Sequence, residues 1–207
     1  AAPMQTLFHW ALGEFGWQIV HAAAVGNEPG GLLLVGGTGA GKSTTAVSCL
    51  DGSCLRFLCD DKCLVRLEPE PQAFALFSSA KIKADMLNRF PHLRERLQGW
   101  DDHFKAGKGL VFLHPDFSDR MIRSFPIKSL VIPRVKRCEQ AHMHPASPGK
   151  LFIALGPSTA IWLPGAEADN YRLTANLTRR LPCHELDLAL ASDRNTAALV
   201  ALLKELS

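Results

Sequence analysis

The sequence predicts an α/β fold in which a mixed β-sheet is flanked by helices. Short apolar runs of strand length alternate along the chain with segments whose apolar residues recur at helical spacing. A glycine-rich segment joins one of these strand-like runs to a helix-like segment. Several short strand candidates crowd the middle of the chain, which indicates a mixed sheet rather than an all-parallel one.

Length and composition limit the classes of function. The chain has 207 residues, which fits one domain, and we expect residues 1–207 to be a domain cut from a longer chain whose N-terminal part is missing. Hydrophobic residues make up 47% and charged residues 21%, as in an ordinary globular protein. The net charge of +3 gives no reason to expect a nucleic-acid partner. No apolar run approaches the roughly 20 residues of a membrane span, and the start does not read as a signal peptide, so we expect a cytoplasmic protein.

The six cysteines are expected to be reduced thiols. Four of them lie within fifteen residues: Cys49, Cys54, Cys59 and Cys63. Their spacing contains no CxxC pair, which argues against a zinc site. Cys138, His142 and His144 form a second group with metal-binding side chains, but no fourth ligand is evident near them in the sequence.

The first half of the chain predicts short strands around the glycine-rich segment. Apolar residues at helical spacing predict a first helix over 4–15, which Gly16 ends. Residues 27–30 have the composition of a turn. The predicted strands are 17–25, interrupted by His21, then 31–35, 55–59 and 63–67, and a helix is predicted over 42–50.

The second half is less regular. Residues 84–97 predict one helix broken at Pro91, because proline cannot donate a hydrogen bond in a helix interior. Residues 98–109 are polar and are expected to form a mobile loop. The remaining predicted strands are 110–113, 127–132 and 183–188, and the remaining predicted helices are 147–154, 169–180 and 193–206.

The glycine-rich segment is a phosphate-binding loop of the Walker A type. Residues 36–43 fit G-x-x-x-x-G-K-[ST] at every fixed position, between a predicted strand and a predicted helix. Glycines let backbone N–H groups converge on phosphate oxygens, and the helix directs its positive end at the same anion. Lys42 is expected to reach the β- and γ-phosphates, and the Ser43 hydroxyl to bind Mg²⁺. The residues expected to bind the nucleotide, ATP, are Gly36, Gly37, Thr38, Gly39, Ala40, Gly41, Lys42, Ser43 and Thr44.

Two adjacent carboxylates, Asp60 and Asp61, follow the predicted strand 55–59. A carboxylate at a strand end beside a P-loop is placed to bind Mg²⁺. One carboxylate can hold the metal while the other accepts the proton of an attacking hydroxyl, so the pair favours phosphoryl transfer over simple hydrolysis. Because only sixteen residues separate Ser43 from Asp60, we expect the strand that ends at Asp60 to lie directly beside the P-loop strand.

Three parts of the sequence together resemble the HPr kinase/phosphorylase-like serine kinase family, whose P-loop core is shared with phosphoenolpyruvate carboxykinases. These parts are 21–25, 31–44 and the Asp60-Asp61 pair; His21 stands fifteen residues before the first motif glycine, as a histidine does in that family. The resemblance implies a fold like the HPr kinase C-terminal domain. It also implies that Asp61 is the general base, that Lys42 and His21 are further catalytic residues, and that Asp60 is the metal-side carboxylate. The sequence looks closest to the branch beside peptide-tailoring enzymes, which includes kinases of lasso peptide precursors.

The leading expectation is a single P-loop kinase domain that uses ATP and Mg²⁺ to phosphorylate a serine of a peptide or small protein. Nucleic-acid and membrane partners are not expected, and homo-oligomerisation is left open. Two alternatives stand: a small-molecule kinase related to carboxykinases, and a binding module in which nucleotide orders residues 98–109 and recruits a partner. Lys81, Arg120 and Arg123 are candidates to neutralise charge on the transferred group.

Overall fold

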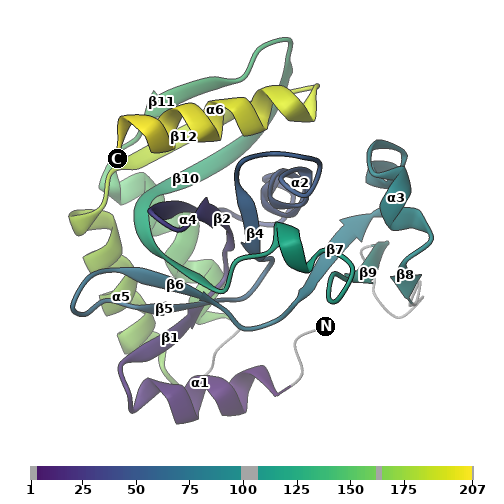
Figure 1. The fold of residues 1–207 in the computed structure, drawn as a ribbon. Helices are drawn as coiled ribbons and strands as arrows, with labels where there is room; N and C mark the ends of the chain where they lie inside the picture. The colour runs from purple at the N-terminus through teal and green to yellow at the C-terminus, as the bar shows by residue number, and fades with distance from the viewer. Residues whose placement is uncertain (1–3, 99–106, 162–164, 207) are drawn as a thin grey trace.

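The computed structural model describes residues 4–98, 107–161 and 165–206 (Figure 1). In these ranges the chain forms a nine-stranded mixed sheet with helices packed against it and a smaller three-stranded sheet. The predicted α/β class, a mixed sheet flanked by helices, is confirmed. The predicted loop 98–109 lies mostly outside the described residues, and its two ends belong to strands of the smaller sheet.

The elements have the following bounds. The large sheet contains β1 (Trp17–Val20), β2 (Ala23–Asn27), β3 (Gly30–Leu34), β4 (Arg56–Cys59), β5 (Cys63–Arg66), β6 (Gln72–Ala75), β10 (Ser124–Cys138), β11 (His142–Pro145) and β12 (Cys183–Ala189). The small sheet contains β7 (Ser79–Lys83), β8 (Leu97–Gln98) and β9 (Lys108–Phe112). The helices are α1 (Gln5–Gly13), α2 (Lys42–Ser48), η1 (Ala84–Arg89), α3 (Pro91–Arg94), η2 (Ser118–Arg120), α4 (Pro148–Ala160), α5 (Glu167–Arg180) and α6 (Ser192–Glu205).

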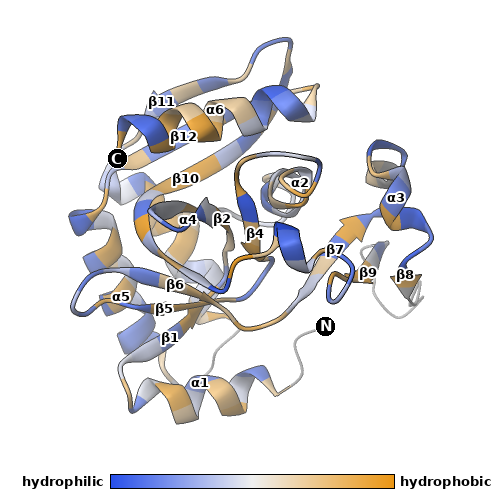
Figure 2. Ribbon diagram, in the orientation of Figure 1, coloured by the Kyte–Doolittle hydropathy of each residue, from blue (hydrophilic) through white to orange (hydrophobic). Residues whose placement is uncertain are grey.

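The long strand β10 organises the large sheet. It pairs with β6 in antiparallel fashion near its start, and further along with β3 on one side and β12 on the other, both in parallel. The P-loop strand β3 therefore lies between β10 and β2 and is buried along its whole length. Figure 2 shows hydrophobic and hydrophilic residues along both β10 and α6.

Both faces of β3 are covered by helices. Leu32 and Leu34 point to one face, where they pack with the buried residues of α2 and α6. Leu33 points to the opposite face, where the buried residues of α4 and α5 cover it. This alternation is the period of two expected for a strand, and burial on both faces explains why the segment reads as an unbroken apolar run.

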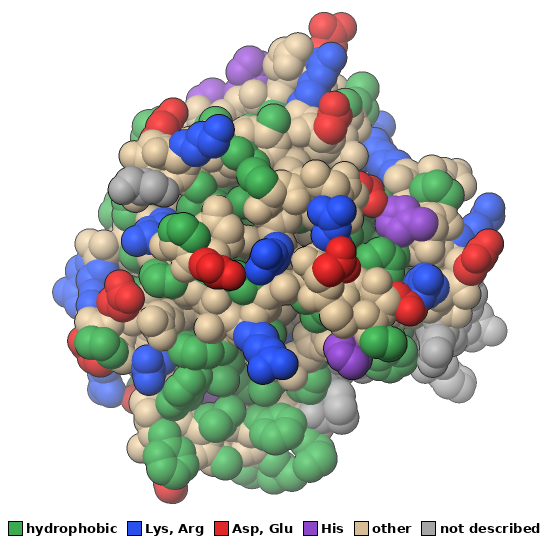
Figure 3. Space-filling view, viewed as in Figure 1, with side chains coloured by type: hydrophobic (Ala, Val, Ile, Leu, Met, Phe, Trp, Pro, Cys, Tyr) green, Lys and Arg blue, Asp and Glu red, His purple; other side chains and the backbone are tan. Residues whose placement is uncertain are grey.

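The helix α1 lies at the edge of the molecule beside β1 (Figure 1). Its side chains Leu7 and Trp10, together with Phe15 just after the helix, are exposed. In Figure 3 hydrophobic side chains gather at the lower edge of the view, where α1 lies. Only one face of α1 therefore contributes to the fold.

Several predictions of local structure need correction. Residues 84–97 do not form one broken helix: they form η1, the short helix α3 and the first residue of β8. Pro91 does not break α3 but starts it, at a position where the missing N–H costs nothing. Strands β6, β7 and β11 were not predicted, and helix α4 continues past Pro157, beyond its predicted end.

The predicted contact between the P-loop strand and the strand that ends at Asp60 is wrong. Strand β2 lies between β3 and β4 and pairs with both in antiparallel fashion. The reason is that β2 and β3 form a hairpin through the turn at 28–29, and β4 adds to the open edge of β2. Since β3 and β4 are consequently parallel, their carboxyl ends still meet at one edge of the sheet, where the P-loop and Asp60-Asp61 begin.

The hairpin of β2 and β3 depends on a close approach of two glycines. A Cβ atom on Gly26 would lie 2.6 Å from the Gly31 Cα and 2.7 Å from the Gly30 carbonyl oxygen. Because backbone atoms cannot move aside, we expect Gly26→Ala to lower the free energy of unfolding by about 1–3 kcal/mol, measured by denaturant titration. Gly149→Ala is the matched control, since a Cβ there meets nothing within 4 Å, and it should leave stability unchanged or raise it slightly. Equal destabilisation of the two variants would contradict this account.

Candidate active site

The P-loop wraps around the start of α2 and encloses a lysine. Gly36, Gly39 and Gly41 have φ angles of +135°, +87° and +105°, which side chains rarely allow and which explain the glycines of the motif. The Lys42 amino group donates hydrogen bonds to the carbonyl oxygens of Gly36 at 2.5 Å and Gly37 at 3.2 Å. Burial lowers the pKa of Lys42, and the charges of the two nearby aspartates oppose that effect. The loop therefore holds a buried amino group where phosphate oxygens would bind.

Asp60 ends β4 next to the P-loop serine. Its Oδ2 accepts a hydrogen bond from the backbone N–H of Lys81 at 2.9 Å, whereas its Oδ1 is buried without a hydrogen-bond partner among the described residues. Burial raises the pKa of Asp60, and the hydrogen bond from the Lys81 backbone and the nearby Ser43 hydroxyl act in the opposite direction. An unsatisfied carboxylate oxygen beside a serine hydroxyl suits Mg²⁺, which takes oxygen ligands. Ser43 and Asp60 therefore fit the metal role expected for them.

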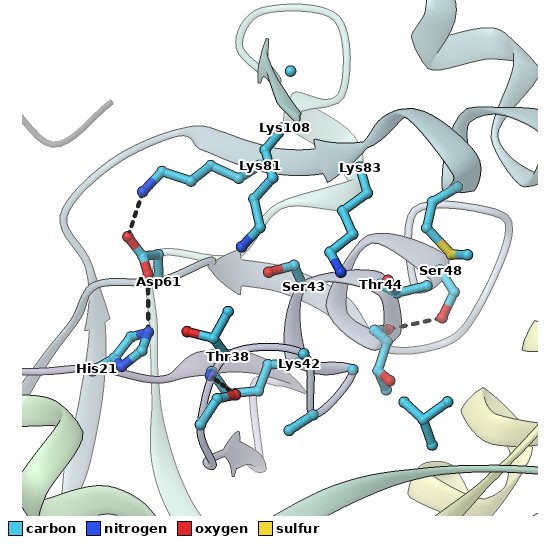
Figure 4. A pocket seen from close by; sticks show the side chains of 18 of the residues that line it. His21, Thr38, Lys42, Ser43, Thr44, Ser48, Asp61, Lys81, Lys83 and Lys108 are labelled. Atoms are coloured by element: carbon cyan, nitrogen blue, oxygen red, sulfur yellow. Dashed lines mark hydrogen bonds and ion pairs between the residues drawn. The ribbon is translucent and has the colours of Figure 1, made fainter. Parts of the chain in front are cut away.

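Asp61 turns the chain between β4 and β5 in a left-handed conformation, with φ of 69°. Few residues other than glycine adopt this conformation, although aspartate does so more readily than most. The carboxylate contacts two donors: Oδ1 lies 3.0 Å from His21 Nε2, and Oδ2 lies 2.7 Å from Lys81 Nζ (Figure 4). Burial alone would raise the pKa of Asp61, but these hydrogen bonds and the charges of Lys62 and Lys81 hold it well below its ordinary range. The carboxylate is therefore ionised.

His21 lies between β1 and β2 and forms hydrogen bonds with both Asp61 and helix α4. Its backbone N–H donates to the Thr159 Oγ1 of α4 at 3.0 Å, and its ring hydrogen-bonds Asp61. The ring Nδ1 is buried with no hydrogen-bond partner in the described part of the chain. Burial lowers the pKa of His21 despite the nearby Asp61 carboxylate. The ring is thus neutral near pH 7 and donates through Nε2 to Asp61.

A cavity of about 1420 Å³ lies between the P-loop and the small sheet. His21 and Asp61 line it together with residues 37–45, so the structure brings most of the predicted site residues into one space. Gly36 and Asp60 are not on its surface and lie buried directly behind the loop and the turn. One end of the cavity is formed by the start of α1 and another by residues of β10 and β12.

Lysine and arginine side chains dominate the charged lining of this cavity. They are Lys42, Lys62, Lys81, Lys83, Arg89, Lys108 and Arg137. The lining residues include a single carboxylate, that of Asp61, among the described residues. Such a concentration of positive charge attracts anionic ligands.

The sequence candidates for charge neutralisation divide into two groups. Lys81 reaches the cavity, as expected. Arg120 and Arg123 do not line it, and Arg120 instead pairs with Asp119 in η2. The sequence reasoning missed Lys83 and Lys108, although the alternation of lysine with apolar residues over 79–83 could have indicated a strand with a basic face.

The described residues contain no group of three or more His, Cys, Asp or Glu side chains close enough to hold a metal ion. The cysteines at 49–63 and at 138 and 183 are free thiols. Among the helices that the structure describes, none has the length and apolar character needed to cross a membrane.

The chain is similar in fold to solved structures, whereas comparison by sequence gives no match. No family model matches the chain, and no curated protein matches its sequence. Among solved structures, the chain is similar to the Hpr(Ser) kinase/phosphatase from Coxiella burnetii, with a TM-score of 0.45 and 12% sequence identity. The similarity covers 91% of this chain and 88% of that one.

The enclosed amino group of Lys42 generates a first test of the site. Lys42→Ala removes the cation that faces the terminal phosphates, so we expect the affinity for Mg²⁺–ATP to fall at least about tenfold in calorimetry. Thermal unfolding gives an independent measure, because ATP should raise the midpoint of the wild type much more than that of the variant. Lys204→Ala is the control: this exposed residue lies in the last turn of α6 and does not line the cavity. Unchanged nucleotide affinity in Lys42→Ala would contradict the assignment of the loop.

Proposed function

We propose that the chain is a Mg²⁺-dependent phosphotransferase of the cytoplasm, which moves the γ-phosphoryl group of ATP to a serine hydroxyl of a peptide or small protein. The observation that carries the proposal is the Asp61 carboxylate, which lines the P-loop cavity and is held there by His21 and Lys81. A carboxylate in this position can take the proton of an acceptor hydroxyl. The expected peptide acceptor, such as a lasso peptide precursor, is part of the same proposal.

The P-loop supplies the binding part of the reaction. In the proposal its backbone N–H groups and Lys42 hold the β- and γ-phosphates, while Ser43 and Asp60 hold Mg²⁺. The bound metal neutralises part of the negative charge on the phosphates. The cavity is larger than the 300–1,000 Å³ or so of an ordinary small-molecule pocket, which leaves room for an acceptor beside the nucleotide.

Asp61 supplies the proton-accepting part. In the ligand-free site Asp61 is a weak base, because His21 and Lys81 both donate to it. A γ-phosphate oxygen in the cavity would compete for the Lys81 amino group, and loss of that hydrogen bond would raise the pKa of Asp61. Oδ2 could then accept the serine proton as the serine oxygen bonds to phosphorus and the bond to the ADP oxygen breaks. His21 would keep Oδ1 in place throughout.

Asp61→Asn tests the assignment of the base. Asparagine keeps the size of the side chain and tolerates the left-handed backbone, but it cannot accept the proton. We expect turnover to fall about 10² or more, with Mg²⁺–ATP affinity within about threefold of the wild type. The assay follows labelled ATP with a panel of serine peptides, and mass spectrometry locates the phosphate. The exposed Asp119→Asn in η2 is the control and should retain full activity.

Two outcomes of this experiment would contradict the proposal. Full turnover in Asp61→Asn would show that Asp61 is not the base. The wild type could also bind nucleotide without phosphorylating any acceptor. If it then recruits a partner as well as the Asp61→Asn variant does, the chain is a nucleotide-gated binding module instead.

The Nδ1 of His21, which has no hydrogen-bond partner among the described residues, favours one rival chemistry, in which the ring itself receives the phosphoryl group. We expect no phosphohistidine, because Nε2 already donates to Asp61 and fixes the ring as a positioning group. His21→Ala should therefore lower turnover about tenfold, while phosphate still appears only on the substrate serine. An acid-labile, base-stable phosphoenzyme in the wild type that disappears in His21→Ala would overturn direct transfer.

A further inference from the structure

The small sheet presents a basic face to the P-loop. Along β7 the side chains of Ala80 and Ile82 are buried in the hydrophobic core, whereas Lys81 and Lys83 line the cavity. On the neighbouring strand Lys108 lies directly opposite Lys83 in the antiparallel register. In Figure 4 the amino groups of Lys83 and Lys108 extend from this sheet toward Ser43 and Thr44. We name Lys81, Lys83 and Lys108 the lysine face.

The lysine face brings like charges together in the described part of the chain. Like charges directly opposite each other in an antiparallel pair repel and destabilise the sheet. No carboxylate of the described residues forms an ion pair with Lys83 or Lys108, and Lys81 is paired with Asp61. The charge of Lys108 also contributes to lowering the pKa of Lys42 on the opposite wall, behind the larger effect of burial. An anion bound between the two walls would relieve this repulsion.

The nucleotide accounts for only part of this positive charge. Its terminal phosphates are assigned to Lys42 and the loop amides, and bound Mg²⁺ cancels part of their charge. Among the described lining residues, the other cations still outnumber the Asp61 carboxylate after the nucleotide is bound. The acceptor must enter this same space, because its hydroxyl has to reach Asp61.

We propose that the lysine face binds an acidic acceptor, a peptide whose serine is flanked by carboxylate side chains. This inference rests on the proposed function. Lys81 contacts Asp61, where the serine hydroxyl would lie, and Lys83 follows two positions later on the same face, roughly 7 Å further along the strand. Carboxylates one to three residues from the serine in an extended peptide would therefore lie beneath Lys83 and Lys108.

The test compares three peptides of equal length in which the serine is flanked by Glu, Gln or Lys. For the wild type we expect the KM of the Glu peptide to be at least about tenfold below that of the Gln peptide, and to rise with ionic strength. Lys83→Gln and Lys108→Gln should each raise the KM of the Glu peptide about fivefold, with kcat and the Kd of Mg²⁺–ATP within about twofold. Lys204→Gln, the same charge change outside the cavity, should alter neither constant.

Three results would overturn the inference while the proposed function stands. The first is an equal KM for the Glu and Gln peptides in the wild type. The second is a weaker Kd for Mg²⁺–ATP in Lys83→Gln and Lys108→Gln with an unchanged peptide KM, which would assign the lysine face to the nucleotide phosphates. The third is a lower midpoint of thermal unfolding for these ligand-free variants, since removing a repulsive charge should preserve or raise it.

A binding measurement separates failure of the inference from failure of the proposed function. If no peptide is phosphorylated, the proposed function fails, and fluorescence anisotropy of the labelled Glu peptide on protein loaded with Mg²⁺–ADP still tests the lysine face. The inference is supported if the wild type binds the Glu peptide preferentially and if this binding weakens in Lys83→Gln and Lys108→Gln. Equal binding of the Glu and Gln peptides overturns it.

Discussion

Two hydrogen bonds from Lys81 to the Asp60-Asp61 turn determine how the site is assembled. The backbone N–H of Lys81 binds Asp60, and its amino group binds Asp61 at 2.7 Å. Because Lys81 belongs to β7, these contacts fix the small sheet against the end of β4. The lysine face is thereby held opposite the P-loop, and the cavity between the two walls depends on this connection. Besides this connection, β7 is held by its pairing with β9 and by the buried side chains of Ala80 and Ile82.

Locally unfavourable features gather around this cavity. Asp61 has a left-handed backbone, Lys83 lies opposite Lys108, and Asp60 has a buried oxygen with no partner among the described residues. Each costs stability in the free protein, and each would be relieved or used by a ligand in the cavity. Strain and unsatisfied polar groups concentrate in this way at functional sites, where binding free energy can offset them.

The parts of the fold that could be predicted are those with a local signal in the sequence. The glycines and Lys42 predicted the position of the loop, and the apolar runs beside it predicted β3 and α2. The position of β2 between β3 and β4 could not be predicted, because the choice of strand neighbours depends on contacts between distant residues. Strand β7 was missed because only Ala80 and Ile82 mark its buried face, so Lys83 was not recognised as part of the site. Lys108 was missed because residues 98–109 were predicted to form a loop, whereas β9 begins at Lys108.

In the proposed reaction Lys81 binds first Asp61 and then the γ-phosphate, and this exchange favours one order of substrate binding. While His21 and Lys81 both donate to Asp61, the pKa of Asp61 stays low and the carboxylate is a poor proton acceptor. An acceptor that enters first meets this weak base, so its hydroxyl keeps the proton. In the proposed reaction, a nucleotide that enters first would bring the γ-phosphate, which would draw Lys81 away from Oδ2 and strengthen the base before the hydroxyl arrives. The Lys81–Asp61 pair would thus couple proton acceptance to occupancy of the P-loop, with His21 holding the carboxylate in both states.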